Sequence, residues 1–349
     1  SIAPSLKSVY EIDYQNYQVI FVDDGSVDHT LAIVTEVASQ HPHIATQILT
    51  KPNGGKASAL NFGLAHATGE LVLCVDSDSR LAKTGLRSAV TRFEDPLVAS
   101  VGGHVYIASF KNLLLRFQQL EYLLGLNFPR RTMSLFGSVC VVPGPVGLFR
   151  RRYLLEAGGY HTDRSNFAED AELTIRLLTH GWRIHSDEDL IAYTEGPETV
   201  EALLRQRYRW VRGMHQAVQI HWRALKKVGV FRGRLIATHL LIETSFLPIF
   251  NMGMTVFFLS LFFHSGVTKI FGLYLVYTAV IDMCRVAIGI HDNKKSPSWF
   301  FLILIEKPIY SFMLQTWALL SLFDEWRQEE MSWDKLERTG QIESTRRAS

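Results

Sequence analysis

The chain has 349 residues, which is long enough for one large domain and a smaller one, and 47% of its residues are hydrophobic. Its formal net charge of +2 gives no indication of a nucleic-acid partner, and we expect none. The three cysteines, Cys74, Cys140 and Cys284, lack metal-ligand spacing and cannot all pair. This excludes a cysteine metal cluster and favours reduced thiols.

Short strands and helices alternate in the first part of the chain. Runs of β-branched and apolar residues predict strands at 18–22, 44–49 and 71–75, and the segments between them predict helices at 30–39 and 57–67. This alternation favours an α/β fold with a mainly parallel sheet and helices on both faces. Ligands of such sheets bind outside the carboxyl ends of the strands. The side chains that fall there are Asp23, Asp24, Asp76 and Asp78.

Two segments follow before the chain becomes strongly apolar. The spacing of leucines and phenylalanines at 111–128 suits an amphipathic helix, for which covering the sheet is favoured over direct contact with a substrate. Residues 143–147 read Pro-Gly-Pro-Val-Gly and predict a tight, rigid loop.

Apolar segments at 235–263, 270–290 and 299–323 are each long enough to cross a bilayer about 30 Å thick at 1.5 Å per residue. Arginines and lysines crowd the approach to the first segment, which is typical of a cytoplasmic flank. Three spans are possible, but one segment could instead be interfacial or re-entrant. The reason is that Glu243, Pro248, Glu306 and Pro308 place charges and helix breakers inside the segments.

Five short motifs stand in a fixed order along the chain. They are Val-Asp-Asp-Gly-Ser at 22–26, Asn-Gly-Gly-Lys at 53–56, Asp-Ser-Asp at 76–78, Ala-Glu-Asp at 168–170 and Gln-Arg-Tyr-Arg-Trp at 206–210. Together they resemble the processive family 2 glycosyltransferases, which include the synthases of cellulose, chitin, hyaluronan and poly-N-acetylglucosamine. This resemblance implies a GT-A-like fold. It covers about two thirds of the chain.

The resemblance also sets the expected domains. Relatives begin with a further strand, so we expect that the N-terminal part, including the first strand, is missing here. We expect a cytosolic GT-A glycosyltransferase domain at 1–230, transmembrane or interfacial helices at 231–323 and a polar C-terminal tail at 324–349.

Donor binding is expected at the first three motifs. Two carboxylates one residue apart at a strand end can present oxygens to a hard cation such as Mg²⁺. The resemblance implies that Asp78 binds Mg²⁺ or Mn²⁺, that Asp76 contacts the ribose or phosphate and that Asp24 contacts the uracil or ribose. Lys56 would add a positive charge near the diphosphate. The structural alternatives are a polar turn, an ordinary loop and a solvated lysine at a helix start.

The fourth motif is expected to carry the catalytic base. Glu169 and Asp170 open a predicted helix, where carboxylates are favoured by the helix dipole. By resemblance to the family's Thr-Glu-Asp motif, Asp170 deprotonates the acceptor hydroxyl as it attacks the anomeric carbon, inverting the configuration. Ala168 replaces the usual threonine. The alternative is an acidic pair that only stabilises the helix.

The fifth motif is expected near the acceptor and the diphosphate. Gln206, Arg209 and Trp210 match the family's Gln-x-x-Arg-Trp motif, which separates polymer-forming synthases from simpler transferases. A guanidinium suits a diphosphate, and an aromatic face suits a sugar ring. An interfacial helix with arginine and tryptophan at headgroup depth is the alternative, and both descriptions can hold together.

The leading hypothesis is a membrane-bound, inverting glycosyltransferase that extends a β-linked polysaccharide from a UDP-sugar, with N-acetylglucosamine the favoured sugar. Its expected partners are the growing polysaccharide, the lipid bilayer and accessory export subunits. We expect a multi-pass protein of a bacterial plasma membrane with a cytoplasmic catalytic domain. The alternatives are a single-addition transferase acting on a lipid-linked acceptor, and an inactive membrane subunit that binds a nucleotide sugar.

Overall fold

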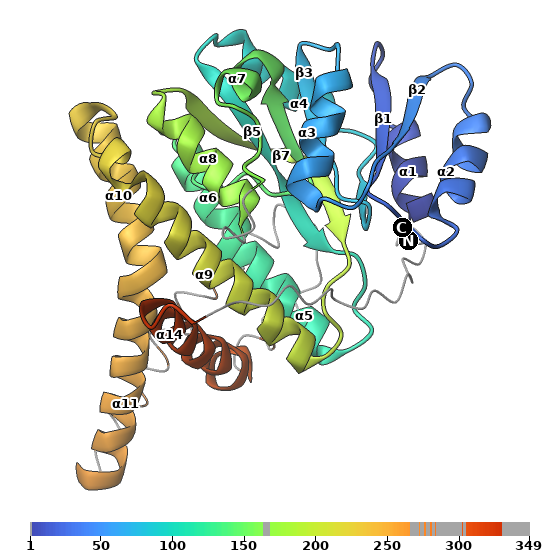
Figure 1. Cartoon of the computed structure of the whole chain (residues 1–349). Helices are drawn as coiled ribbons and strands as arrows, with labels where there is room; N and C mark the ends of the chain where they lie inside the picture. Colours follow the sequence, from blue (N-terminus) through green and yellow to red (C-terminus); the bar gives the residue numbers. More distant parts are fainter. Residues whose placement is uncertain are drawn as a thin grey trace.

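The computed structural model describes residues 2–162, 168–265 and 305–329, together with single positions between 272 and 302. Its first elements are α1 (Ile2–Tyr10), β1 (Gln18–Asp23), α2 (Thr30–Ser39), β2 (Ala45–Thr50) and α3 (Lys56–His66). Strands β1 and β2 form a parallel two-stranded sheet (Figure 1). The predicted helix at 30–39 is confirmed at both ends. The predicted strand at 18–22 is one residue shorter than β1, and the predictions for β2 and α3 are displaced by one residue.

A second sheet has five strands in the order β3-β6-β5-β7-β4. They are β3 (Leu71–Cys74), β4 (Ser79–Leu81), β5 (Val98–Ile107), β6 (Gly147–Arg150) and β7 (Arg183–Thr194). Only β5 and β7 pair in parallel, and the other three pairs are antiparallel. The prediction of a mainly parallel sheet is therefore wrong, and the sheet is mixed. Strand β6 enters from the loop at 143–146 and not from a crossover helix, so its approach does not impose a parallel direction.

Strand β5 is the central strand of the five. All ten of its residues are buried. One face is covered by a continuous helix made of α5 (Leu113–Glu121), the π-helical turn η2 (Tyr122–Asn127) and α6 (Phe128–Ser134). Leu115 and Tyr122 of this helix pack with Val101 and Val105 of β5. The prediction that the segment at 111–128 covers the sheet is confirmed.

The other face carries α8 (Glu169–Thr179), whose Leu173 and Ile175 pack with Phe149 of β6. Helix α9 (Val200–Leu225) lies against α8 (Figure 1). Its N-cap is Thr199, whose side-chain oxygen accepts a hydrogen bond from the Ala202 amide at 3.2 Å. The short helices α4 (Leu86–Thr91), η1 (Arg92–Glu94) and α7 (Arg151–Glu156) complete this part.

Beyond α9 the chain forms a long rod that projects from the two sheets (Figure 1). It consists of η3 (Gly229–Gly233), α10 (Arg234–Leu241), η4 (Ile242–Phe246) and α11 (Leu247–Ser265). Within the part of the chain that the structure describes, Phe231–Met254 is the one helix long and apolar enough to cross a membrane. The predicted span at 270–290 lies outside the described residues, apart from single positions.

The last described segment comprises the π-helical turn η5 (Glu306–Ser311) and α14 (Phe312–Trp326). The charges and prolines that interrupt the apolar segments lie in π-helical turns or, for Pro248, directly after one. Glu243 lies in η4, which ends at Phe246, two residues before Pro248. Pro308 lies in η5. Proline lacks an amide hydrogen and its ring displaces the carbonyl four residues earlier, so a widened turn lets each helix continue.

Candidate active site

Asp24, in the turn after β1, fixes a neighbouring loop. The Asp24 carboxylate accepts hydrogen bonds from Lys51 Nζ at 2.6 Å and from the amides of Gly54 and Gly55 at 2.9 and 2.7 Å. Partial burial works against ionisation, but these bonds hold the pKa of Asp24 below its ordinary value. Gly25 turns the chain with φ 78°. Asp24 thus fixes the loop that leads into α3.

Lys56, the first residue of α3, joins three elements. Its Nζ lies 2.7 Å from Asp76 Oδ1, just beyond β3, and 3.2 Å from Glu169 Oε1 at the start of α8. Burial alone would lower the pKa of Lys56, but Asp76, Glu169 and Asp170 together raise it. A Cβ atom added to Gly144 would lie 2.7 Å from the Lys56 Nζ. The predicted rigid loop therefore lies directly against this ion pair.

Asp170 lies one residue further along α8, and its Oδ1 accepts a hydrogen bond from the Ala171 amide at 2.8 Å. Burial and the nearby charges of Glu169 and Asp76 raise its pKa to about 6, against the opposing effect of Lys56. A carboxyl group with this pKa is ionised at neutral pH. It is also far more basic than an ordinary aspartate, which suits general-base catalysis.

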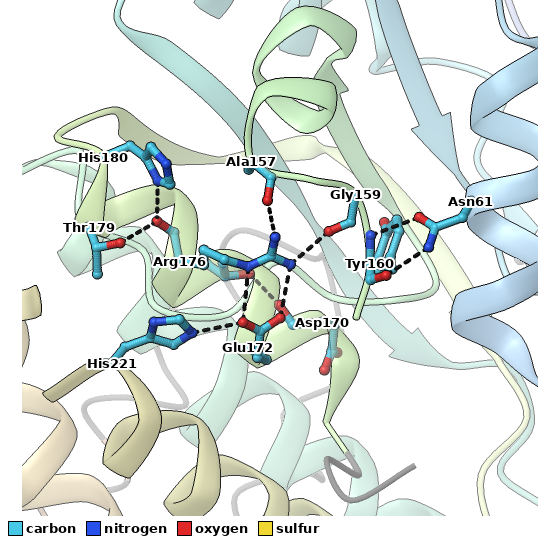
Figure 2. Close-up of polar contacts among 11 residues, drawn as sticks. Asn61, Ala157, Gly159, Tyr160, Asp170, Glu172, Arg176, Thr179, His180 and His221 are labelled. Carbon is cyan, nitrogen blue, oxygen red and sulfur yellow. Dashed lines mark hydrogen bonds and ion pairs between the residues drawn. The ribbon is translucent and has the colours of Figure 1, made fainter. Parts of the chain in front are cut away.

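A network of charged side chains holds α8 in place (Figure 2). Glu172 is fully buried and accepts hydrogen bonds from Arg176 Nε and Nη2, both at 3.0 Å. His221 of α9 lies 2.7 Å from the same carboxylate. Burial disfavours the carboxylate, but His221 and Arg176 nevertheless lower the pKa of Glu172. The helix that carries Asp170 is therefore joined to the helix that carries the fifth motif.

The segment at 157–160 is held between α8 and α3, as Figure 2 shows. Arg176 donates to the carbonyls of Ala157 and Gly159, the latter at 2.7 Å. Asn61 of α3 donates to the Tyr160 carbonyl at 2.7 Å and accepts from the Tyr160 amide at 2.8 Å. The Tyr160 hydroxyl donates to Cys74 Sγ at 3.3 Å. These bonds fix one wall of a small cavity.

This cavity brings together residues that are far apart in the sequence. It is lined by Lys56, Glu169, Asp170, Cys74, Tyr160 and the loop residues Pro143 and Gly144. Positive charge, a basic carboxylate and an apolar wall therefore face one space. The cavity itself is small, but this set of side chains combines a positive charge that can offset a negative group with a carboxylate that can accept a proton.

Asp78 is buried in the turn that follows β3. It is 8% exposed, and Ser79 Oγ donates to its Oδ1 at 3.2 Å. Among the described residues, no group of three or more His, Cys, Asp and Glu side chains could surround a metal ion. Mg²⁺ is often bound by only one or two carboxylates together with substrate phosphates, so Asp78 with Asp76 fits such an ion.

The fifth motif lies on α9. Trp210 packs against Tyr122 of η2, with 6.3 Å between the ring centroids, and Arg207 lies over Trp210 at 4.2 Å. Gln206 accepts a hydrogen bond from Arg207, and Arg209 is partly exposed. Burial raises the pKa of Tyr122 to about 12, with Arg207 opposing this and Glu121 and Asp78 adding to it. The side chain of Tyr122 thus lies within reach of both the motif helix and Asp78.

Comparison with known families defines the class of the chain. The family described as "Glycosyltransferase like family 2" matches residues 2–213, more than half of the chain. The chain belongs to glycosyltransferase family 2. The family resemblance of the ordered motifs is confirmed.

Among curated relatives of this glycosyltransferase is the poly-beta-1,6-N-acetyl-D-glucosamine synthase of Staphylococcus aureus. It is 27% identical over 219 residues, which are 62% of this chain and 52% of the relative. An N-acetylglucosaminyltransferase of Bradyrhizobium diazoefficiens is 34% identical over 238 residues, which are 65% of this chain and 49% of the relative. The chain thus spans about half the length of the curated relatives it matches.

A solved structure supports the fold. The mannosyltransferase PcManGT from Pyrobaculum calidifontis, in complex with GDP-Man and Mn²⁺, superposes with a TM-score of 0.62 at 20% identity. The match covers 94% of this chain and 84% of that chain. At this identity the likeness shows the fold, and this glycosyltransferase has the GT-A-like fold that the motifs predicted.

The structure brings together Lys56, Asp76 and Asp170, with Asp24 joined to them through the loop before α3. Sequence reasoning did not identify Tyr160, Cys74 or Glu121 as site residues. The glycine pair at 158–159, both with positive φ, is a sequence signal for a sharp turn ahead of Tyr160. No comparable signal marks Cys74 or Glu121.

Proposed function

We propose that this chain is the catalytic part of a membrane-bound, inverting glycosyltransferase that extends a β-linked polysaccharide from a UDP-sugar. N-acetylglucosamine is the sugar we favour, because the names of the two curated relatives both refer to it. One observation carries the proposal: a carboxyl group with a pKa of about 6 lines the same cavity as the lysine that begins α3.

Asp170 takes the proton of the acceptor hydroxyl. The acceptor oxygen forms a bond with the anomeric carbon of the donor as the bond from that carbon to the diphosphate breaks, and UDP leaves with its electron pair. Attack from the face opposite UDP inverts the configuration. A base with a pKa near 6 is ionised in the cytoplasm and still accepts a proton readily as the hydroxyl becomes acidic in the transition state.

Donor binding is assigned to the ends of β1 and β3 and to the start of α3. Lys56 exchanges part of its contact with Asp76 and Glu169 for the diphosphate, whose charge it offsets as UDP forms. Asp76 and Asp24 contact the nucleotide, and Asp24 also fixes the loop ahead of Lys56. Asp78 would hold Mg²⁺ or Mn²⁺, which when bound supplies positive charge to the diphosphate.

The motif on α9 is assigned to the acceptor side. Trp210 presents an aromatic ring to the sugar, and Gln206 and Arg209 lie on the same helix, where they are placed to contact the diphosphate or the acceptor. Repeated addition is supported by this motif, which by resemblance separates polymer-forming synthases from simpler transferases.

The membrane part of the proposal assigns 1–230 to the cytosolic domain, 231–323 to helices in or on the bilayer and 324–349 to the tail. The apolar helix Phe231–Met254 supports it, and so do apolar side chains exposed along the rod, among them Phe246, Ile249 and Phe257. The bacterial sources of both relatives favour a bacterial plasma membrane. Accessory export subunits would take over the product.

The test is Asp170→Asn in the full chain, compared with Glu36→Gln, which changes an exposed carboxylate on α2. We expect Asp170→Asn to lower the transfer rate by about 10²–10⁴-fold and to leave UDP affinity within about threefold. Polymer synthesis retained by Asp170→Asn would contradict the assignment of the base. A product extended by one sugar only would favour single addition.

A further inference from the structure

Glu121, the last residue of α5, binds two partners that come from distant parts of the chain. Its carboxylate accepts two hydrogen bonds from Arg207, from Nε and from Nη2, each at 2.7 Å. It also accepts the hydroxyl of Tyr310. The side chains of Glu121 and Arg207 are 20% and 7% exposed, and Tyr310 is 1% exposed. This is a charged pair largely removed from water, in which each group relies on the others.

Arg207, which is held by Glu121, stacks on the ring of Trp210. Its guanidinium lies 4.2 Å from the centre of the Trp210 ring and 5.9 Å from that of Tyr122. A planar guanidinium held at two of its three nitrogens by one carboxylate cannot turn freely, and this restricts the ring stacked on it as well. Glu121 is therefore linked to Trp210 through the Arg207 side chain.

Tyr310 connects the C-terminal segment at 305–329 to Glu121. It lies in η5, whereas the family match ends at residue 213. Its ring packs with Phe117 of α5 at 5.5 Å between centroids, and Leu203 of α9 joins the same cluster. The second partner of the Glu121 carboxylate thus comes from outside the residues that the family matches.

Helix α14 then ties the segment to α9 along its length. Trp317 Nε1 donates to the Leu204 carbonyl at 2.7 Å. Arg212 Nε donates to Glu325 at 2.6 Å, and Tyr208 donates to Asp324 at 3.0 Å. These contacts do not involve Arg207. They hold the two helices together independently of Glu121, which separates attachment of the segment from positioning of Trp210.

We propose that Glu121 and Tyr310 are positioning residues that hold Arg207 beneath Trp210, so that the C-terminal segment at 305–329 sets the affinity for the acceptor sugar. This inference rests on the proposed function, because it assigns Trp210 to the acceptor. It predicts a selective effect: acceptor binding depends on Tyr310, whereas donor binding at the ends of β1 and β3 does not.

The experiment compares Tyr310→Phe, Glu121→Gln and the control Trp317→Phe in the full chain. The control also loses one hydrogen bond between the C-terminal segment and α9, but away from Arg207. Transfer from UDP-N-acetylglucosamine is measured against the concentration of a β-1,6-linked N-acetylglucosamine oligosaccharide, and UDP affinity is measured separately. Tyr310→Phe removes one hydroxyl only, so it remains informative if Glu121→Gln, which leaves Arg207 without its charged partner, fails to fold.

We expect Tyr310→Phe to raise the acceptor KM by about three- to tenfold, with kcat and UDP affinity within about twofold of the unaltered chain. Trp317→Phe should leave the acceptor KM unchanged. An unaltered acceptor KM in Tyr310→Phe, in a chain that transfers sugar, would overturn the inference and leave the proposed function intact. Equal losses of acceptor and UDP affinity in Tyr310→Phe would also overturn it, because they indicate a general structural role. Absence of transfer by the unaltered chain would overturn the proposed function and the inference together.

Discussion

Replacing Asp170 with asparagine should change stability in a way that depends on pH. Burial, Glu169 and Asp76 raise the pKa of Asp170 from 3.8 to about 6, so the folded state prefers the protonated carboxyl. The free energy of unfolding therefore falls as pH rises between these values, because the unfolded chain has already released this proton. The gap corresponds to about 3 kcal/mol above pH 6. Asparagine carries no charge and avoids this loss.

Thermal melting of Asp170→Asn and the unaltered chain at several pH values tests this reasoning. The variant should gain about 3 kcal/mol at pH 8, about half of that at pH 5 and close to none below pH 4. For a chain of this size each kcal/mol raises Tm by about 2 °C. Glu36→Gln, an exposed change, should show no such trend. A variant less stable than the unaltered chain at pH 8, or a difference independent of pH, would refute the account of the Asp170 environment.

Three further predictions concern the donor site. Gly144→Ala should raise the donor KM by about threefold or more with little change in Tm, because the added methyl group meets the flexible end of Lys56 at 2.7 Å. An unchanged donor KM in steady-state assays would argue against contact between Lys56 and the diphosphate. Asp24→Ala should weaken UDP binding, seen by calorimetry, by about 2 kcal/mol, because two amides and a lysine lose their acceptor; undiminished affinity would count against this loop. Chelation with EDTA should abolish transfer, and added Mn²⁺ should restore it. The Asp78→Ala variant should need far more Mn²⁺ than the unaltered chain to reach half of its maximal rate. Full activity in EDTA would exclude a metal at Asp78.

Much of the fold near the N-terminus follows from local patterns. The helix at 30–39 and the strands on either side are marked by apolar periodicity and by turn residues, which act over a few positions. The direction of β4 and β6 is not marked in this way, since pairing in a sheet is decided by contacts between distant segments. The prediction of a mainly parallel sheet extended a pattern seen up to residue 75 to strands that do not follow it.

In the candidate site, too, residues in short motifs could be predicted, whereas contacts between distant segments could not. The positions of Asp24, Asp76 and Asp170 could be predicted, because each stands in a short motif at the end of a strand or the start of a helix, and their roles stay predictions. The link between Glu121 and Tyr310 joins residues 189 positions apart and has no local signal. Nor does a local pattern mark His221, which lies against buried Glu172 and connects α9 to the helix of Asp170.

The central claim is tested most directly by radiolabelled transfer from a panel of UDP-sugars, with Mg²⁺ or Mn²⁺, by membranes that contain the full chain. The account predicts high-molecular-mass product from one donor, with UDP-N-acetylglucosamine the expected one. UDP binding without any transfer, or a product that ends after one sugar, would contradict it.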